Sequence, residues 1–217
     1  MTLTRGMDQL ESARLVLRRI APEDLPFFTR LHALPEVARG LYPEGRPRTP
    51  DEVTVWLRRT LAGCQELALG HLAVQRKADG ALIGRCGLTE LVVETVVPEH
   101  GLRRGWFGRD SVPAGLALTF ERELGYTFDP AFWGQGLATE AARCVCDYAR
   151  GELRLSCAVS VILPHNARSR RVAERLGARG DGQMDVGGRT FDRYVWRLTR
   201  GGPTGTRRGS DGDGRGR

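Results

Sequence analysis

Long apolar runs are missing from this 217-residue chain, and none approaches the roughly 18 apolar residues that a membrane-spanning helix needs. The first segment, residues 1–19, is polar and has no apolar h-region, so no secretory signal is predicted. A composition with 41% hydrophobic and 27% charged residues is typical of a globular protein. We therefore expect a cytoplasmic protein without membrane contact.

Cysteine is scarce and odd in number, which argues against a disulfide framework. Cys144 and Cys146 have the C-x-C spacing of some metal ligands, but residues two apart on a helix point in different directions. No Cys/His cluster accompanies them. Reduced thiols and no metal site are expected, and the five cysteines are Cys64, Cys86, Cys144, Cys146 and Cys157.

Lysine is almost absent, since Lys77 is the only one, and arginine supplies nearly all of the positive charge. The net charge is +7, and the segment from residue 199 onward contributes +3 of it with five Arg and two Asp. A basic balance favours anionic partners such as a nucleotide cofactor, nucleic acid or the ribosome. It does not choose among them, and a genome rich in Arg codons explains it equally well.

The pattern of apolar residues predicts alternating strands and helices. Strands are expected over residues 14–20, 69–76, 81–89, 116–128, 155–163 and 191–198. Helices are expected over residues 22–34, from a capping box at 49–52 to about 61–63, and over 136–150 and 167–176. Turns are expected at residues 78–80 and 185–189. Residues 91–113 read as an insertion that begins as a strand and continues as a loop.

Two further features concern glycine. Gly125 inside a strand suggests a bulge or a close backbone approach. From residue 201 the chain is Gly, Arg, Asp, Ser and Thr without an apolar anchor, so it cannot offset its ordering entropy. The sequence thus predicts one folded domain over residues 1–200 and a disordered Gly/Arg-rich tail over 201–217.

The segment Trp133-Gly134-Gln135-Gly136-Leu137-Ala138 places two glycines at the start of a helix. Backbone N–H groups there have no intrahelical partners and lie at the positive end of the helix dipole. Such a turn suits a pyrophosphate. It is neither a G-x-G-x-x-G dinucleotide fingerprint nor a Walker A loop, and a purely structural role is the alternative.

A second polar patch, residues 164–171, directly follows a buried strand. Ser169 lies three residues after Asn166, so one helical turn can place both side chains on the same side. Asn166 as an N-cap with Ser169 in the first turn explains the patch equally well by itself.

Together the two patches resemble the GCN5-related N-acetyltransferase (GNAT) superfamily over residues 14–198. The resemblance rests on residues 124–141, then on Asn166-Ala167-Arg168-Ser169 and Ala173-Glu174-Arg175-Leu176-Gly177. The superfamily pattern Arg/Gln-x-x-Gly-x-Gly/Ala falls on Trp133-x-x-Gly136-x-Ala138. Trp at the first position departs from the general pattern but is usual in the Rim-type branch, which acetylates ribosomal-protein N-termini.

The resemblance implies an α/β (α+β) GNAT fold, with a mixed, mostly antiparallel twisted sheet of about six to seven strands and about four flanking helices. It implies acetyl-CoA as cosubstrate, with the pantetheine arm between Phe128 and Asn166 and the ribose phosphate near Arg171 or Arg168. The N–H groups that would hold the pyrophosphate belong to Gln135, Gly136, Leu137, Ala138 and Thr139.

The implied reaction is direct attack of an amine on the thioester. By resemblance, Ser169 would donate a proton or hydrogen bond to the CoA thiolate and Glu123 would act as base through water, with Glu90 as a competing carboxylate. Because a terminal α-amine has a pKa near 8 and a lysine near 10.4, a modest base leans towards an α-amine, such as a protein N-terminus.

Three alternatives stay open from the sequence. The acceptor can be a small amine, such as an antibiotic, a polyamine or an amino acid. The domain can be a non-catalytic acyl-CoA-binding module. The Arg-rich tail can anchor nucleic acid or the ribosome, although it lacks aromatic residues for stacking and no specific nucleic-acid site is expected. A homodimer is compatible with exposed strand edges.

Overall fold

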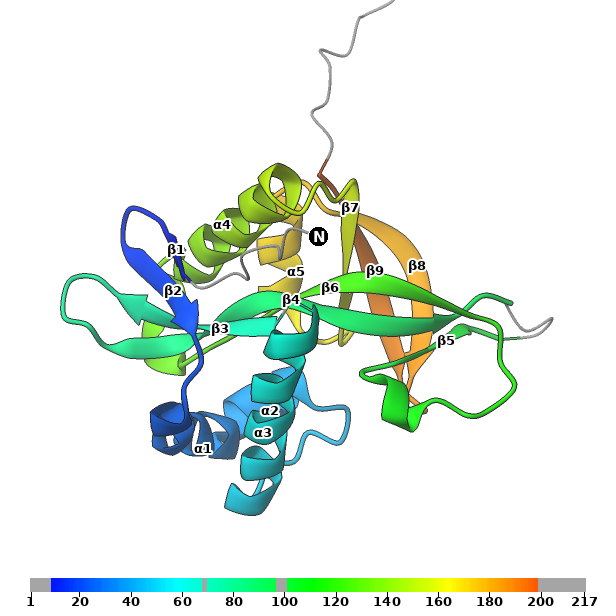
Figure 1. Ribbon diagram of the computed structural model, residues 1–217, viewed down its shortest axis with the longest axis horizontal. Coiled ribbons are helices and arrows are strands. Elements are labelled where there is room, and N and C mark those ends of the chain that lie inside the picture. Colours follow the sequence, from blue (N-terminus) through cyan, green and yellow to red (C-terminus); the bar gives the residue numbers. More distant parts are fainter. Residues whose placement is uncertain (1–8, 68–69, 97–100, 199–217) are drawn as a thin grey trace, which may run out of the picture.

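A mixed sheet of nine strands runs through the residues that the structure describes, 9–67, 70–96 and 101–198 of a computed structural model (Figure 1). The strands are β1 (Gln9–Glu11), β2 (Leu15–Arg19), β3 (Gly70–Arg76), β4 (Leu82–Glu94), β5 (Arg103–Trp106), β6 (Leu118–Phe128), β7 (Cys157–Ile162), β8 (Arg179–Val186) and β9 (Thr190–Arg197). The β5–β8 and β6–β7 pairs are parallel and the others are antiparallel.

Five α-helices belong to the same described residues: α1 (Leu25–Ala33), α2 (Pro35–Leu41), α3 (Pro50–Leu67), α4 (Leu137–Gly151) and α5 (Ala167–Arg175). The expected capping box starts α3, since Thr49 Oγ1 accepts from the Glu52 amide at 3.3 Å and the Glu52 carboxylate accepts from the Thr49 amide at 2.8 Å. None of these helices is long and apolar enough to cross a membrane.

The two faces of the sheet are covered by different helices. Helix α4 covers one face with an apolar stripe, because Leu137, Ala141 and Val145 are buried in one cluster with Leu124 and Phe128 of β6. On the other face, α1, α2 and α3 build a second cluster. Since side chains alternate along a strand, the intervening β6 residues at 123, 125 and 127 face the α1–α3 side.

One end of the sheet closes on itself. Strand β4 pairs with β5 and β6, and the circuit continues through β7, β9 and β8 back to β5. A third apolar cluster, which includes Leu91, Met184 and Phe191, fills this closed end.

The opening that matters for function lies between β6 and β7. Among the described residues these strands share a single register pair, Glu123 with Val159. Just beyond it, Ser160 Oγ donates to the Leu124 carbonyl at 2.6 Å. The remainder of β6, up to Phe128, has no strand partner on that side and leaves its edge open to a ligand.

The fold class is confirmed, but the expected six to seven strands and four helices become nine and five. Sequence patterns miss β1, β5, β8 and α2. Residues 100–111 read as loop because they are rich in Gly and Arg, yet β5 pairs with both β4 and β8. Strand β8 contains Gly180 and Gly182, poor strand formers that pairing with β9 overrides. The expected tail, residues 201–217, lies outside the described residues.

The expectation for Gly125 is half right. Strand β6 pairs with β4 in unbroken register through Gly125, so there is no bulge. The close approach is present, because a Cβ at this position would lie 2.9 Å from both Glu123 Oε2 and His71 Nε2. Glycine here lets two ionisable side chains meet over one backbone position.

Candidate functional site

The Gly-rich turn has the geometry of an anion site. Gly134 and Gly136 both have φ +76°, a left-handed conformation that favours glycine. Gly136 is the N-cap of α4, and its carbonyl accepts the first helical hydrogen bond from the Glu140 amide at 3.0 Å. The amides of Leu137, Ala138 and Thr139 therefore have no partner within the helix and lie at its positive end.

Arg14, the residue before β2, contacts this turn. Its guanidinium donates to the Gln135 carbonyl at 3.1 Å and forms an ion pair with Glu140 at 2.7 Å. Ser12 Oγ and the Arg14 amide also donate to Glu140. The one acidic side chain in the first turn of α4 is thus neutralised, which keeps the turn favourable for an anion.

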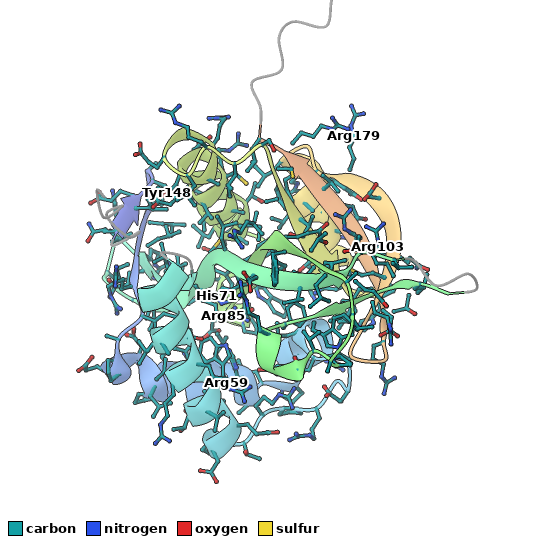
Figure 2. The ribbon with its side chains drawn as sticks, turned by 45° about the vertical axis from the view of Figure 1, so that its right-hand side comes forward. Arg59, His71, Arg85, Arg103, Tyr148 and Arg179 are labelled. Atoms are coloured by element: carbon teal, nitrogen blue, oxygen red, sulfur yellow. The ribbon has the colours of Figure 1, made fainter. Side chains whose placement is uncertain are left out.

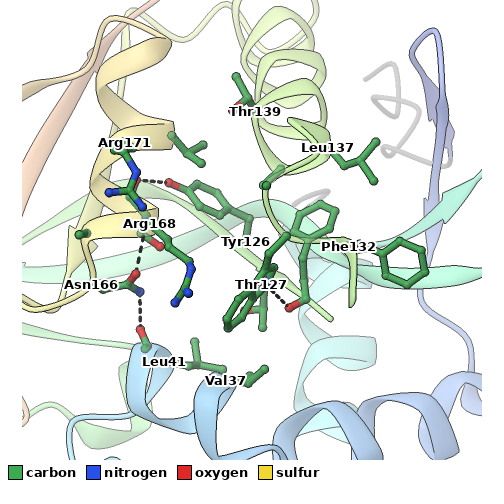
Figure 3. Close-up of a pocket in the computed structure, with 18 of the residues that line it drawn as sticks. Val37, Leu41, Tyr126, Thr127, Phe132, Leu137, Thr139, Asn166, Arg168 and Arg171 are labelled. Atoms are coloured by element: carbon green, nitrogen blue, oxygen red, sulfur yellow. Dashed lines mark hydrogen bonds between the residues drawn. The ribbon is translucent and has the colours of Figure 1, made fainter. Parts of the chain in front are cut away.

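A cavity of about 650 Å³ opens beside this turn (Figure 3). Its walls come from the end of β6, the residues before and at the start of α4, the start of α5, and α2. This volume lies in the usual range for a cofactor pocket. The predicted site residues that line it are Phe128, Gly136, Leu137, Ala138, Thr139, Asn166, Ser169 and Arg171. Gln135 and Glu123 do not line it.

Helix α2, which sequence patterns miss, is joined to the start of α5. Asn166 Nδ2 donates to the Gly40 carbonyl at 2.8 Å, and His165 Nε2 lies 2.6 Å from the Arg39 carbonyl. Asn166 Oδ1 also accepts from the Ser169 amide at 3.1 Å, which makes Asn166 the N-cap of α5. Asn166 therefore links α2 and α5, two walls of the cavity, because its Nδ2 bonds to α2 and its Oδ1 bonds to α5.

Tyr126 is a cavity residue that the sequence reading overlooked. Its hydroxyl donates to the Ser169 backbone carbonyl at 2.9 Å, and burial raises the pKa of this phenol. The signal was available, because the period of two along β6 puts Tyr126 on the same face as Phe128. Ser169 is half-buried, and its Oγ has no hydrogen-bond partner among the described residues. Both hydroxyls are thus candidates to protonate a leaving group.

Trp133 and Arg168 face each other across the cavity. The guanidinium carbon of Arg168 lies 4.4 Å from the Trp133 ring centroid, a cation–π contact between α5 and the Gly-rich turn. The Trp133 indole N–H donates to the Phe128 carbonyl at 2.8 Å. The Phe128 carbonyl on the open edge of β6 is therefore occupied by Trp133.

Glu123 lies on the other face of β6 and is 7% exposed. Burial raises the pKa of this carboxyl from 4.5 to about 7, opposed by a 3.0 Å hydrogen bond from Thr89 Oγ1 and by the charge of Arg85. Such a pKa suits a general base at neutral pH.

Glu90, the competing carboxylate, has a different environment. It pairs with Arg109 at 2.7 Å and with Arg122 at 3.4 Å. The hydrogen bond from Arg109 lowers its pKa, against a smaller effect of burial. Neighbouring residues of a strand point to opposite faces of the sheet. Glu90 therefore lies on the face opposite Thr89, which donates to Glu123. The geometry therefore favours Glu123 as the base.

No group of three or more His, Cys, Asp or Glu side chains that could hold a metal ion occurs in the described part of the chain. Cys86, Cys144, Cys146 and Cys157 are free thiols.

Comparison with known proteins shows the family to which this chain belongs. The model of the family described as "Acetyltransferase (GNAT) domain" matches residues 14–179. FsC-acetyl coenzyme A-N(2)-transacetylase of Aspergillus fumigatus is 30% identical over 173 residues, which cover 80% of this chain and 66% of that protein. Matches to the curated relatives span from a third to about two thirds of their lengths.

Solved structures agree on the fold. An acetyltransferase from Agrobacterium tumefaciens strain C58 matches with TM-score 0.68 and 25% identity, covering 91% of this chain and 98% of that one. Mycobacterium smegmatis RimJ in complex with CoA-disulfide matches with TM-score 0.61 and 16% identity, covering 88% and 87%. The latter likeness concerns the fold alone.

Proposed function

Because this chain belongs to the acetyltransferase (GNAT) domain family, we propose that it transfers an acetyl group from acetyl-CoA to a primary amine by direct attack. The chain carries an N-acetyltransferase domain whose cosubstrate is acetyl-CoA. In the proposed reaction the amine nitrogen attacks the thioester carbonyl, the C–S bond breaks, and the CoA thiolate takes up a proton. The nitrogen loses one proton to a base.

The cofactor residues follow from the cavity. The first-turn amides of α4, from Leu137 to Thr139, would hold the pyrophosphate. The edge of β6 and the start of α5 at Asn166 would flank the pantetheine arm. Arg171 lines the same cavity and carries a positive charge suited to the ribose phosphate. Ser169 would donate to the thiolate, with the Tyr126 hydroxyl beside it.

The observation that carries the proposal is the environment of Glu123. Its carboxyl is buried, its pKa is raised to about 7, and it lies on β6 where that strand parts from β7. A group that is partly ionised at neutral pH can take the amine proton, directly or through a water molecule.

The same pKa bears on the acceptor. At pH 7 on the order of a tenth of an α-amine is neutral, against under a thousandth of a lysine side chain. A base of this strength suits an amine of low pKa, such as the α-amine of a protein N-terminus, as in the Rim-type branch, or a small-molecule amine of similar pKa. The name of the Aspergillus relative places its acetyl transfer at a nitrogen numbered 2.

The test is a free-thiol release assay with acetyl-CoA and three acceptor sets: peptides with free N-termini, α-amino acids and polyamines. We expect turnover with α-amines, and a kcat that rises with pH through an apparent pKa of about 7. Thr89→Val removes a hydrogen bond to the ionised carboxyl and should move that pKa upward. Acetyl-CoA binding without turnover on any acceptor would contradict the proposed reaction and indicate a non-catalytic binding module.

A further inference from the structure

A buried polar cluster lies on the face of β4 and β6 opposite the cofactor cavity's helix α4. Arg85 on β4 and Thr127 on β6 are register partners, so their side chains share the face that α1 and α3 cover. The charge of Arg85 also acts on His32 of α1 and His71 of β3. All four side chains are between 1% and 8% exposed, and Figure 2 shows His71 and Arg85 beside each other under the sheet.

Three polar atoms of this cluster have no hydrogen-bond partner among the described residues: Arg85 Nε, His32 Nε2 and Thr127 Oγ1. A buried polar group without a partner is unfavourable, and native proteins satisfy such groups with protein, water or a ligand. The three atoms come from three different elements, α1, β4 and β6. A partner from outside the described residues is therefore needed to satisfy them.

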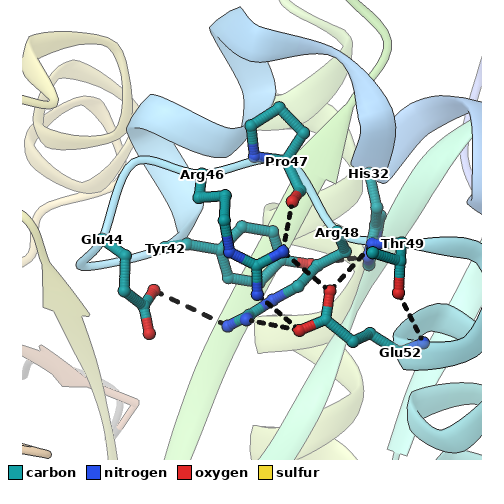
Figure 4. A network of polar contacts seen from close by, with 8 residues as sticks. All are labelled: His32, Tyr42, Glu44, Arg46, Pro47, Arg48, Thr49 and Glu52. Atoms are coloured by element: carbon teal, nitrogen blue, oxygen red, sulfur yellow. Dashed lines mark hydrogen bonds and ion pairs between the residues drawn. The ribbon is translucent and has the colours of Figure 1, made fainter.

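The missing partner has to be a hydrogen-bond acceptor. Arg85 can only donate, and its Nη1 already donates to His71 Nε2. Burial, with the charges of Arg85 and Arg48, lowers the pKa of His32 to about 3, so this ring is neutral. Its Nδ1 lies 2.7 Å from the Tyr42 hydroxyl (Figure 4). With Tyr42 donating to Nδ1, the ring proton is on Nε2.

The loop before α3 holds this arrangement in place. The Arg48 guanidinium lies 4.1 Å from the centroid of the Tyr42 ring and pairs with Glu52 at 3.3 Å. Arg46 also pairs with Glu52, at 2.5 Å. Figure 4 shows this network beside His32. The Tyr42 hydroxyl that faces His32 Nδ1 is therefore positioned by contacts that reach the surface.

None of the ion pairs among the described residues includes Arg85, and its guanidinium also lies 5.3 Å from the Trp56 ring centroid. Burial lowers the pKa of Arg85, opposed by Tyr42 and by Glu123, whose own pKa is raised by burial. A buried charge without a partner is strongly unfavourable, and a ligand carboxylate would supply the missing negative charge.

The cluster is adjacent to the proposed chemistry. Glu123 Oε2 and His71 Nε2 each lie 2.9 Å from the place where a Cβ on Gly125 would be. Thr127 also lines the cofactor cavity. Glu123 and the Arg85–His71 pair therefore approach the same backbone position, which matches a molecule whose amine and carboxylate are close together.

Building on the proposed acetyl transfer, we propose that the acceptor is a compact amino-carboxylic acid, such as an α-amino acid. Its carboxylate binds Arg85, His32 Nε2 and Thr127 Oγ1, and its amine faces Glu123. Arg85 is then a specificity-determining residue that distinguishes free amino acids from peptides and simple amines.

The experiment compares each of the twenty L-amino acids with its own amide in the free-thiol assay, on wild type, Arg85→Gln and Thr127→Val. The amide keeps the amine and removes the negative charge; it also lowers the pKa of the amine, which works against the expected preference for the acid. We expect at least one amino acid to exceed its amide in kcat/KM by about 10- to 100-fold, the range for hydrogen bonds to a charged group. This ratio should fall to about one in Arg85→Gln and decrease several-fold in Thr127→Val, which keeps the side-chain shape.

Binding is measured separately as the rise in Tm that the same amino acid gives to the CoA-bound protein, with an unchanged response to CoA itself reporting that each variant is folded. A rise in wild type that is lost in Arg85→Gln supports the carboxylate site even if no acceptor turns over, a result that would overturn only the acetyl transfer. Amides or peptides that are acetylated as well as amino acids would overturn the carboxylate site and leave the acetyl transfer standing.

Discussion

Replacing Glu123 by Gln tests the environment of the proposed base. A pKa of about 7 in place of 4.5 means that the folded protein favours the protonated carboxyl by roughly 3 kcal/mol, at 1.36 kcal/mol per pKa unit. The unfolded chain ionises this group above about pH 4.5. Stability from the neutral carboxyl is therefore present below that pH, is lost as the pH rises towards 7, and is fully lost above it.

Glutamine keeps an acceptor for the Thr89 hydroxyl but never ionises, so Glu123→Gln avoids this loss. We expect the free energy of unfolding of the variant to exceed that of wild type increasingly as the pH rises, by up to about 3 kcal/mol at pH 8. Each kcal/mol corresponds to roughly 2–4 °C in Tm. Urea unfolding and thermal scans between pH 5 and pH 8.5 measure the difference. In the same variant kcat should fall by about 10²- to 10⁴-fold, as for loss of a general base.

Glu90→Gln is the matched control. Its carboxylate is ion-paired and its pKa is lowered, so this substitution should bring no gain in stability as the pH rises. Parallel stability curves for wild type and Glu123→Gln across the whole pH range would refute the reasoning, because Glu123 would then ionise equally in the folded and unfolded states.

Two further predictions concern the cofactor side. Gly136→Asp places a side chain and a negative charge at the proposed pyrophosphate position and should abolish acetyl-CoA binding, as measured by calorimetry. Gly177→Asp, just after α5, is the control for backbone strain because Gly177 has a similar φ of +84°. This control variant should bind acetyl-CoA normally. Ser169→Ala should lower kcat about 10- to 100-fold with the KM for acetyl-CoA little changed. Tyr126→Phe removes only the hydroxyl that donates to the Ser169 carbonyl and should keep most of the turnover, and the reverse pattern would transfer the role to Tyr126.

Short-range sequence signals predicted much of the structure around the cofactor cavity. A capping box starts α3, paired glycines precede α4, and Asn166 caps α5, because each depends on residues within four positions of one another. The apolar stripe of α4 is equally local, with a period that any helix imposes. These short-range rules, joined to the family resemblance, located the turn beside which the cavity opens.

Elements without a local signal were missed. Strand β8 has glycines where a strand former is expected, and β5 lies in a segment rich in Gly and Arg. Both exist because distant strands supply their hydrogen bonds, a contribution that no window of sequence contains. Helix α2 completes the cavity through carbonyls that Asn166 and His165 contact from 126 residues away.

The sequence by itself determined the Gly-rich turn at Gly136 and the cap at Asn166, since these follow from local backbone conformation, and the fold class followed from the family resemblance. Only the tertiary structure decided what Glu123 and Arg85 do. A carboxylate and a guanidinium in a strand read as solvated surface, and their chemistry changes because α1 and α3 bury that face of the sheet. Burial raises the pKa of Glu123, and Arg85 has no ion pair among the described residues; burial is a property of the assembled fold.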